Sequence, residues 1–552
     1  MTAEEKGAVE MASEAPPLPP PPVNRRSVLL AVFIAFGGFL FGYDIGGCLI
    51  MPDFIMRFGQ SDGNGGFVLS SSRQSIITSL LSAGTFVGAL AQALTSDRFG
   101  RRGSILIWSA IFTVGVAVQT GTTFSIVQIT IGRFIAGLGV GALSAIVPLY
   151  NGETAPKRIR GTMLVLYQLQ IIMGIFLSYV IDLGTHSIKS SASWRIPVGL
   201  QLLWGLILLS EARRVIAELN SVPEDDLLVL DLIAEIDEGI HAENNGGKAT
   251  WLECFSARSQ LWKRTINGMM LQFIQQLNGQ NFYYYYGDTF FKSAGTQLSP
   301  YVIQTILGAV SVVGTLPALY LIETWGRRKS LLTGAVMEAV CSLIVSSPTL
   351  LACLPLVVYP TLTQPPQAGV AGFVLLPSPG TDVSTITLTS SNKRGGDVLI
   401  AFAILHVFSY SIFWGPTPWV YLGESFPLRV RAKCIALGSA TNWIWNFLLS
   451  FFAPRIAARI GPLILLIFFG MLVFGYVFVY FAIPEVKGLS LEEVDELYRS
   501  GVRPWRSASW RPSGKGVQQL RRVEGERLDT NVIAVDEVRE RSRSRWNEIQ
   551  IN

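Results

Sequence analysis

The stretches DRFGRR, at residues 97–102, and ETWGRR, at residues 323–328, are two versions of one motif. A second motif also occurs twice, as ETAPKRIRG at residues 153–161 and as ESFPLRVRA at residues 424–432. Every copy adjoins apolar segments, and the two copies of each motif occupy matching places in the two halves of the chain. Recurrence of this kind indicates paired repeats of the type that membrane transport proteins contain.

Outside these motifs the apolar residues are gathered into long runs. The chain has 552 residues, of which 50% are hydrophobic and only 15% charged, which is less charge than a soluble chain carries. A helix needs about 20 apolar residues to cross a bilayer. Apolar segments occur at about 28–51, 75–95, 103–121, 126–150, 162–182, 196–209, 265–287, 300–322, 330–358, 397–421, 434–454 and 461–483. We therefore predict an all-α integral membrane protein with twelve transmembrane helices in two six-helix bundles.

Polar segments set the expected domain boundaries. Residues 1–26 hold a proline run and residues 486–552 are rich in Arg and Glu, so both are expected to be solvated tails. Between them we expect an N-terminal bundle at 27–209, a central loop at 210–263 and a C-terminal bundle at 264–485. The basic residues near the span ends fall on one side, which predicts a cytoplasmic location for both termini and the central loop.

Several classes of function are disfavoured by composition. The net charge is only +5, which gives no indication of nucleic-acid binding. The five cysteines and three histidines are scattered without the spacing of metal ligands. No nucleophile–base pattern is present either, so we expect neither an enzyme nor a bound metal or cofactor.

Two segments depart from the repeat. The second half holds about 45 additional residues between its two motifs, centred on a Pro-, Thr- and Ser-rich stretch at 346–392. We expect a long outward-facing loop over 346–396. The sixth apolar run, 196–209, would form a helix of only about 21 Å, against a hydrocarbon core of about 30 Å. Either this span is truncated and accommodated by bilayer thinning, or the gene model is imperfect at both places.

Many short motifs stand in the order typical of one family. They are GFLFGYDIGG, DRFGRR, GRFIAGLGVG, PLYNGETAPKRIRG, YQLQIIMGI, SWRIPVGLQ, QQLNGQNFYYYYG, WGPTPWVYLGESFPLRVRAK, NWIWNF and PEVKGLSLEE. Over about residues 28–495 the chain resembles the sugar-porter branch of the major facilitator superfamily (MFS), and it is most similar to fungal hexose transporters. The resemblance implies the MFS fold and transport of a hexose-type sugar by alternating access.

The chain also departs from that family at particular positions. The signature that usually follows the sixth span is missing, Asn151 stands where many relatives have Gln, and Val486 replaces the usual Thr. Ser311 stands where the family usually has Asn, which removes one expected sugar contact.

The seventh apolar run carries three amide side chains, Gln275, Gln276 and Asn281, within QQLNGQN. Amides both donate and accept hydrogen bonds, as a ring of sugar hydroxyls requires. The alternative is that they form hydrogen bonds between helices and hold the bundle together. By resemblance these three residues bind sugar, together with Gln168, Trp419 and Asn446, and Tyr285 and Tyr286 help to close an outer gate.

Trp419 lies in GPTPW, where two prolines are expected to break the tenth helix. A tryptophan in a membrane protein is often an interfacial anchor. Broken helices, however, typically line transport cavities, so we expect Trp419 to contact the sugar.

Asp44 and Arg133 are ionisable residues inside the first and fourth spans. Intramembrane charges are rare and are usually paired across a cavity. A carboxylate can bind a proton, and a guanidinium that stays charged can bias that binding. By resemblance the pair couples transport to protons. The alternative is a structural ion pair, because related facilitators also carry an aspartate here.

The repeated motifs supply two sets of charged residues at the predicted cytoplasmic ends of the spans. We expect them to form ionic contacts that hold the bundles together while the site faces outward. The two sets are Asp97, Arg101, Arg102, Glu153 and Arg160, and then Glu323, Arg327, Arg328, Glu424 and Arg431.

Together these features predict a secondary active transporter that imports a hexose-type monosaccharide, coupled to protons. The expected partners are the sugar, a proton and the lipid bilayer, and the expected protein is a monomer in the plasma membrane. A facilitative sugar uniporter, a non-transporting sugar sensor of the same fold and a non-functional product are the alternatives.

Overall fold

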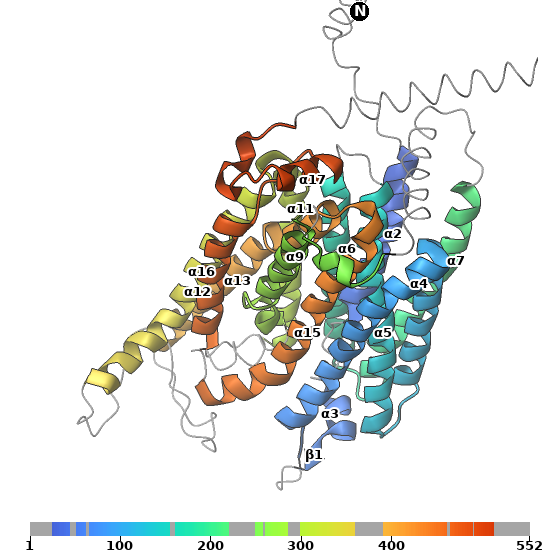
Figure 1. Ribbon diagram of the computed structural model, residues 1–552. Coiled ribbons are helices and arrows are strands. Elements are labelled where there is room, and N and C mark those ends of the chain that lie inside the picture. The colour runs from blue at the N-terminus through green and yellow to red at the C-terminus, as the bar shows by residue number, and fades with distance from the viewer. Residues whose placement is uncertain are drawn as a thin grey trace, which may run out of the picture.

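The computed structural model is almost entirely helical (Figure 1). It describes residues 25–44, 51–61, 66–154, 160–219, 249–257, 260–284, 299–358, 390–460, 464–489 and 491–512. Both predicted tails lie largely outside these residues. The helices run side by side in two groups, with α17 near one end of the molecule and α3 and β1 near the other.

Five long helices form the N-terminal half and account for the first six predicted spans. They are α2 (Arg25–Asp44), α4 (Ser71–Thr120), α5 (Ile126–Thr154), α6 (Arg160–Thr185) and α7 (Ala192–Leu219). Between α2 and α4 lie the short helix α3 (Pro52–Phe58) and an antiparallel pair of strands, β1 (Gln60–Ser61) and β2 (Phe67–Val68), which pair Gln60 with Val68.

The C-terminal half supplies helices for the other six predicted spans. They are α9 (Leu261–Gln276), α11 (Pro300–Trp325), α12 (Arg327–Val358), α13 (Ser390–Ile412) with α14 (Thr417–Glu424), α15 (Leu428–Ile460) and α16 (Ile464–Ala482). Short helices lie before and after them: η3 (Leu252–Phe255), α17 (Leu491–Arg499) and η7 (Pro504–Ser509). Each of the twelve predicted spans therefore has a helix. Seven helical segments within the described residues are long and apolar enough to cross a membrane by themselves.

The internal repeat is visible in the backbone at two glycines. Gly100 of DRFGRR has φ 68° and ψ 174° and kinks α4 between the second and third spans. Gly326 of ETWGRR has φ 89° and ψ 169° and separates α11 from α12. Residues other than glycine rarely adopt positive φ, so the same residue makes the same turn in both halves.

The ninth and sixth spans test two expected boundaries. α12 continues to Val358 and α13 begins at Ser390, so the expected loop over 346–396 is wrong at both ends. The residues from Leu350 to Val358 are mostly apolar and extend the ninth helix, despite the prolines nearby. The sixth span is short, as expected: its apolar part is Ala192–Leu208, although α7 continues to Leu219.

Candidate functional site

The amide side chains of α9 lie where that helix is interrupted. α9 ends at Gln276, Gly279 takes φ 101°, and a helical turn resumes at 280–284. Gln275 and Gln276 are 2% and 7% exposed, so both amides must find partners inside the protein. The interruption places Gln276 and Asn281 side by side, and the Asn281 amide donates a hydrogen bond to Gln276 Oε1.

Gln275 is bonded to the backbone of the broken tenth span. Its Nε2 donates to the carbonyl oxygens of Trp414, at 2.9 Å, and of Gly415, at 2.7 Å. These carbonyls belong to the segment between α13 and α14, where the predicted break in GPTPW is confirmed. A break leaves carbonyls without helical partners. Gln275 therefore stabilises the broken segment by binding two of its carbonyl groups.

α15 completes the cluster with two asparagines. Asn446 Nδ2 donates to Gln276 Oε1 at 3.0 Å. Asn442 Nδ2 donates to Gln272 Oε1 at 2.7 Å and to Gln275 Oε1 at 2.8 Å. The sequence analysis missed Gln272 and Asn442, which precede Gln276 and Asn446 by one helical turn. We call Gln272, Gln275, Gln276, Asn281, Asn442 and Asn446 the amide cluster.

The amide cluster lies at the contact between the two halves. Ser82 of α4 donates to Asn446 Oδ1 at 2.7 Å. Near it, Trp443 Nε1 of α15 donates to Ser144 Oγ of α5 at 2.8 Å. Polar groups from both halves thus meet in the interior of the bundle.

Two further predicted residues lie near the break in the tenth span. Trp419 is 3% exposed, and its ring meets that of Tyr167 edge-on at 5.7 Å between centroids. Gln168 of α6 is buried, and its Nε2 lies 3.4 Å from the place that a Cβ on Gly415 would take. Tyr167 and Gln168 of the N-terminal half therefore lie against the broken tenth span of the C-terminal half.

The predicted outer-gate residues, Tyr285 and Tyr286, lie outside the described residues. The neighbouring Tyr284 forms a hydrogen bond of 2.8 Å with the Ser311 hydroxyl, at the position where an Asn was expected from the resemblance. Tyr179 of α6 donates to the Tyr284 carbonyl at 3.4 Å, which makes another contact between the halves.

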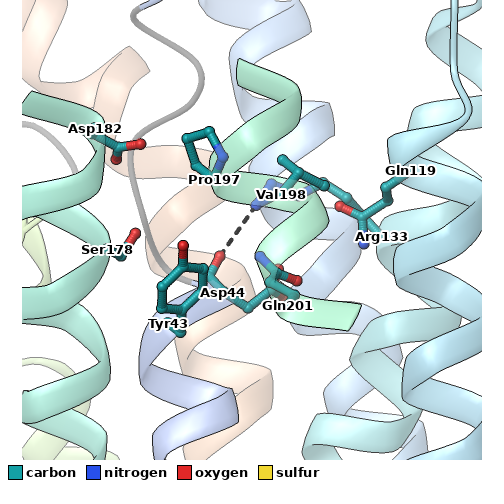
Figure 2. Close-up of a pocket in the computed structure, with 9 residues that line it drawn as sticks. All are labelled: Tyr43, Asp44, Gln119, Arg133, Ser178, Asp182, Pro197, Val198 and Gln201. Carbon is teal, nitrogen blue, oxygen red and sulfur yellow. Dashed lines mark hydrogen bonds between the residues drawn. The ribbon is translucent and has the colours of Figure 1, made fainter. Parts of the chain in front are cut away.

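Asp44 and Arg133 line one small buried cavity in the N-terminal half. Figure 2 shows side chains from α2, α4, α5, α6 and α7 converging on it. Asp44 is 3% and Arg133 6% exposed. The Arg133 guanidinium donates to the main-chain oxygen of Asp44 at 3.4 Å, while Asp44 Oδ2 has no hydrogen-bond partner among the described residues. The expected pair is therefore close together, but its hydrogen bond runs to the backbone.

The same cavity contains a second carboxyl group that the sequence analysis missed. Asp182 of α6 is 1% exposed and lines the cavity with Tyr43 and Gln201. Among the described residues that line the cavity, Arg133 alone carries a positive charge. The lining therefore combines two buried carboxyl groups with one guanidinium.

The charged residues of the repeated motifs form a network centred on Arg327. Its guanidinium is 1% exposed and contacts Glu424 Oε1 at 2.6 Å and Glu323 Oε2 at 3.2 Å. Burial alone would lower the pKa of Arg327, but Glu424 and then Glu323 outweigh it and raise the pKa above its usual value. Arg160 of the N-terminal half also acts on Glu424.

Several of these residues join the halves at the end of the molecule that carries the motifs, which we call the motif end. Lys433, which the sequence analysis did not select, forms an ion pair with Asp97 of α4. The main-chain N of Thr162 donates to Glu323 Oε1 at 3.1 Å, and Arg431 Nη2 donates to the Gly152 carbonyl at 3.3 Å.

The other members of the predicted ionic gate have different surroundings. Arg328 donates from its backbone N to Glu485 Oε2 at 3.0 Å and from its side chain to the Tyr480 carbonyl at 2.9 Å, both within the C-terminal half. Arg101 lies in α4 just beyond the kink at Gly100. Arg102 and Glu153 lie in α4 and α5, but their side chains fall outside the described part of the chain.

The halves also meet at the opposite end, near α3. Arg455 Nη2 lies 3.5 Å from Ser72 Oγ, and the Tyr301 hydroxyl lies 3.8 Å from Met51 Sδ. Thr305 donates to the Tyr179 carbonyl at 3.4 Å. In this conformation the two halves are therefore in contact at both ends and in the middle.

This architecture agrees with one family of proteins. The sequence pattern of the family described as "Sugar (and other) transporter" matches residues 30–358 and 367–498. The chain belongs to this family. Membership makes it a multi-pass membrane protein whose homologues are transporters and not enzymes.

Relatives in the family support the assignment over most of the chain. The low-affinity glucose transporter of Kluyveromyces lactis is 36% identical over 509 residues, which cover 88% of this chain and 85% of that protein. The galactose transporter of Saccharomyces cerevisiae is 35% identical, covering 93% and 89%. The solved proton:xylose symporter XylE, bound to 6-bromo-6-deoxy-D-glucose, is 21% identical with a TM-score of 0.66, covering 86% and 99%, and shows the shared MFS fold.

Proposed function

We propose that this protein carries a hexose-type monosaccharide across the membrane by alternating access. The amide cluster supports this most directly, because it presents neutral donors and acceptors at the contact between the halves. Sugar hydroxyls can exchange hydrogen bonds with such groups, and the rings of Trp419 and Tyr167 offer apolar surface beside them. The relatives named as glucose and galactose transporters agree with this substrate class.

In this proposal, access alternates through the contacts at the two ends. The Asp97–Lys433 ion pair and the Glu323–Thr162 contact separate when the site opens at the motif end. Contacts at the opposite end separate when the site opens there, and Tyr285 and Tyr286 help to close that side. The excess of basic residues supports a cytoplasmic location for the motif end and both termini, in a protein of the plasma membrane.

We further propose that uptake is coupled to protons through Asp44. The cavity supports this role because it holds a guanidinium, a second carboxyl group and an Asp44 carboxylate oxygen that has no partner among the described residues. Facilitated uniport is the alternative, and it assigns Asp44 and Arg133 a purely structural role.

The test of the substrate class is uptake of labelled glucose in cells that lack their own hexose transporters. We expect uptake above that of the empty vector. Uptake equal to the vector, with the protein shown at the plasma membrane, would contradict transport, and sugar binding without flux would favour a sensor. A variant whose sixth span is lengthened by about one turn, roughly four apolar residues, is tested in the same assay. If it restores uptake, the short span was the defect; if it does not, the proposed function is wrong.

Gln276→Ala is expected to weaken sugar affinity about tenfold to a hundredfold. Its Oε1 accepts from Asn281 and Asn446, so truncation leaves buried donors and sugar hydroxyls unpaired, at about 1–3 kcal/mol. The measurement is the concentration dependence of uptake. Gln92→Ala is the matched control, because Gln92 is a fully buried glutamine of α4 outside the amide cluster. Unchanged affinity in Gln276→Ala would make Gln276 a packing residue.

A further inference from the structure

A carboxyl group and an imidazole are buried together in the C-terminal half, away from the Asp44 cavity. Glu338 of α12 and His406 of α13 are both 0% exposed. Counted from Arg327 at the motif end, Glu338 lies about 16 Å along its helix, near the middle of a hydrocarbon core of about 30 Å. Ionisable side chains at this depth are costly, and they usually mark proton or substrate pathways.

In each of the two side chains, one polar atom is hydrogen-bonded and the other has no partner among the described residues. Glu338 Oε2 accepts from Asn278 Nδ2 at 3.0 Å, and Oε1 has no partner among the described residues. His406 Nδ1 lies 3.3 Å from the Glu338 carbonyl and 3.3 Å from Ser342 Oγ. A carbonyl accepts only, so this contact assigns the proton to Nδ1 and leaves Nε2 as a proton acceptor. Within the described chain Nε2 has no partner.

Among the residues that the structure describes, no charged side chain compensates these two groups. The titratable groups facing Glu338 and His406 are Cys341 on α12 and Tyr283, whose ring lies 5.2 Å from that of His406. The buried side chains of α16, which packs on α12, are apolar. Glu338 takes part in none of the ion pairs formed by the described residues. Burying an isolated carboxylate costs far more than burying the neutral acid.

We propose that Glu338 and His406 form a proton-binding site of the C-terminal half. Glu338 holds the proton in the conformation described here. It releases that proton to water when the site opens to one side, and the carboxylate takes up another from the opposite side. His406 binds the Glu338 main-chain carbonyl through Nδ1 and so positions the residue that carries the carboxyl group, while its Nε2 is a second buried proton acceptor of this site.

Asn278 links this site to the amide cluster, and this step rests on the proposed function. Its Nδ2 binds Glu338, while its Oδ1 accepts from the backbone N of Gln280 at 3.0 Å. Asn278 therefore stabilises the non-helical segment that lies between Gln276 and Asn281. A carboxylate is a stronger acceptor than a neutral acid. Loss of the proton strengthens the hydrogen bond between Asn278 and Glu338. Because Asn278 lies in the interruption after α9, this change alters the arrangement of the sugar-binding amides.

The direct test is infrared spectroscopy of the purified full-length protein, because a protonated carboxyl has its own carbonyl band. We expect Glu338→Gln to remove one such band at acid pH, and alkaline titration to remove the same band from the wild type. His406→Gln is expected to move the pH at which that band disappears. Glu253→Gln, which alters a carboxylate of η3 paired with Arg429, is the matched control and keeps the band.

The second arm measures binding of labelled glucose to the same proteins at acid and alkaline pH. In the wild type we expect affinity to change by about 5- to 150-fold, the usual size of coupling between two ligands. Glu338→Gln, which preserves volume and the acceptor for Asn278, should show a smaller pH dependence of glucose affinity than the wild type, and the remainder arises at Asp44. A wild-type protein that binds no glucose contradicts the proposed function alone. A spectrum unchanged by Glu338→Gln overturns the proton site, whatever the sugar result.

Discussion

Replacing Arg327 with methionine is expected to lower the free energy of unfolding by about 3–5 kcal/mol, the usual cost of leaving a buried charge without its partner. Arg327 binds Glu424 through two of its nitrogens, at 2.6 and 2.8 Å, and Glu424 is only 7% exposed. Methionine fills much of the volume and removes the charge. Glu323, which is 24% exposed at its side chain, can be hydrated instead, so the cost arises mainly at Glu424.

Two comparisons isolate this effect in denaturant unfolding of the detergent-solubilised protein. Arg327→Met combined with Glu424→Gln removes both charges and should recover most of the lost stability. Arg429→Met makes the same substitution in the exposed pair with Glu253, where a loss of about 0–1 kcal/mol is expected. If Arg327→Met were as mild as Arg429→Met, the Arg327 network would not be a buried charge pair.

Asp44→Asn is expected to abolish accumulation of sugar against a gradient while sparing exchange between the two sides. The amide resembles a permanently protonated carboxyl, and the amide cluster is formed by residues other than those of the Asp44 cavity. In the wild type, uptake should rise as external pH falls, because protonation of Asp44 loads the coupled ion. A protonophore should collapse the accumulation.

The matched control is Asp53→Asn, which changes a buried aspartate that binds Arg57 and Trp194 and does not line the Asp44 cavity. Folded Asp53→Asn protein should still concentrate sugar. The decisive opposing result is a wild type that equilibrates sugar but never concentrates it under an imposed proton gradient. That result establishes facilitation and makes Asp44 and Arg133 structural.

The fold was predictable because periodic features survive in a single sequence. Apolar runs of the right length gave twelve helices, and the duplicated motifs placed Gly100 and Gly326 at equivalent turns. The prolines of GPTPW predicted the break between α13 and α14. The ninth apolar run, 330–358, ends at the same residue as α12, but the loop expected over 346–396 overlapped it, because a proline-rich composition was interpreted as a loop although apolar residues continue to Val358.

The site was less predictable, because its contacts join helices that are far apart in the chain. The amides of QQLNGQN were visible as polar residues in an apolar run, but nothing indicated that Asn442 would bind Gln275. Lys433 and Asp182 were missed for the same reason. His406 was regarded as a lone histidine, and only the packing of α13 on α12 brings it beside Glu338.

The mutual bonding of the amide cluster has a consequence for turnover. Gln276 Oε1 already accepts hydrogen bonds from Asn281 and Asn446, so a sugar hydroxyl that donates to this oxygen replaces a bond that already exists. Exchange of one hydrogen bond for another yields only a small net free energy. We infer that cargo is held loosely enough to leave quickly on the far side. A cluster of unpaired donors would bind the sugar more tightly and would slow its dissociation in each transport cycle.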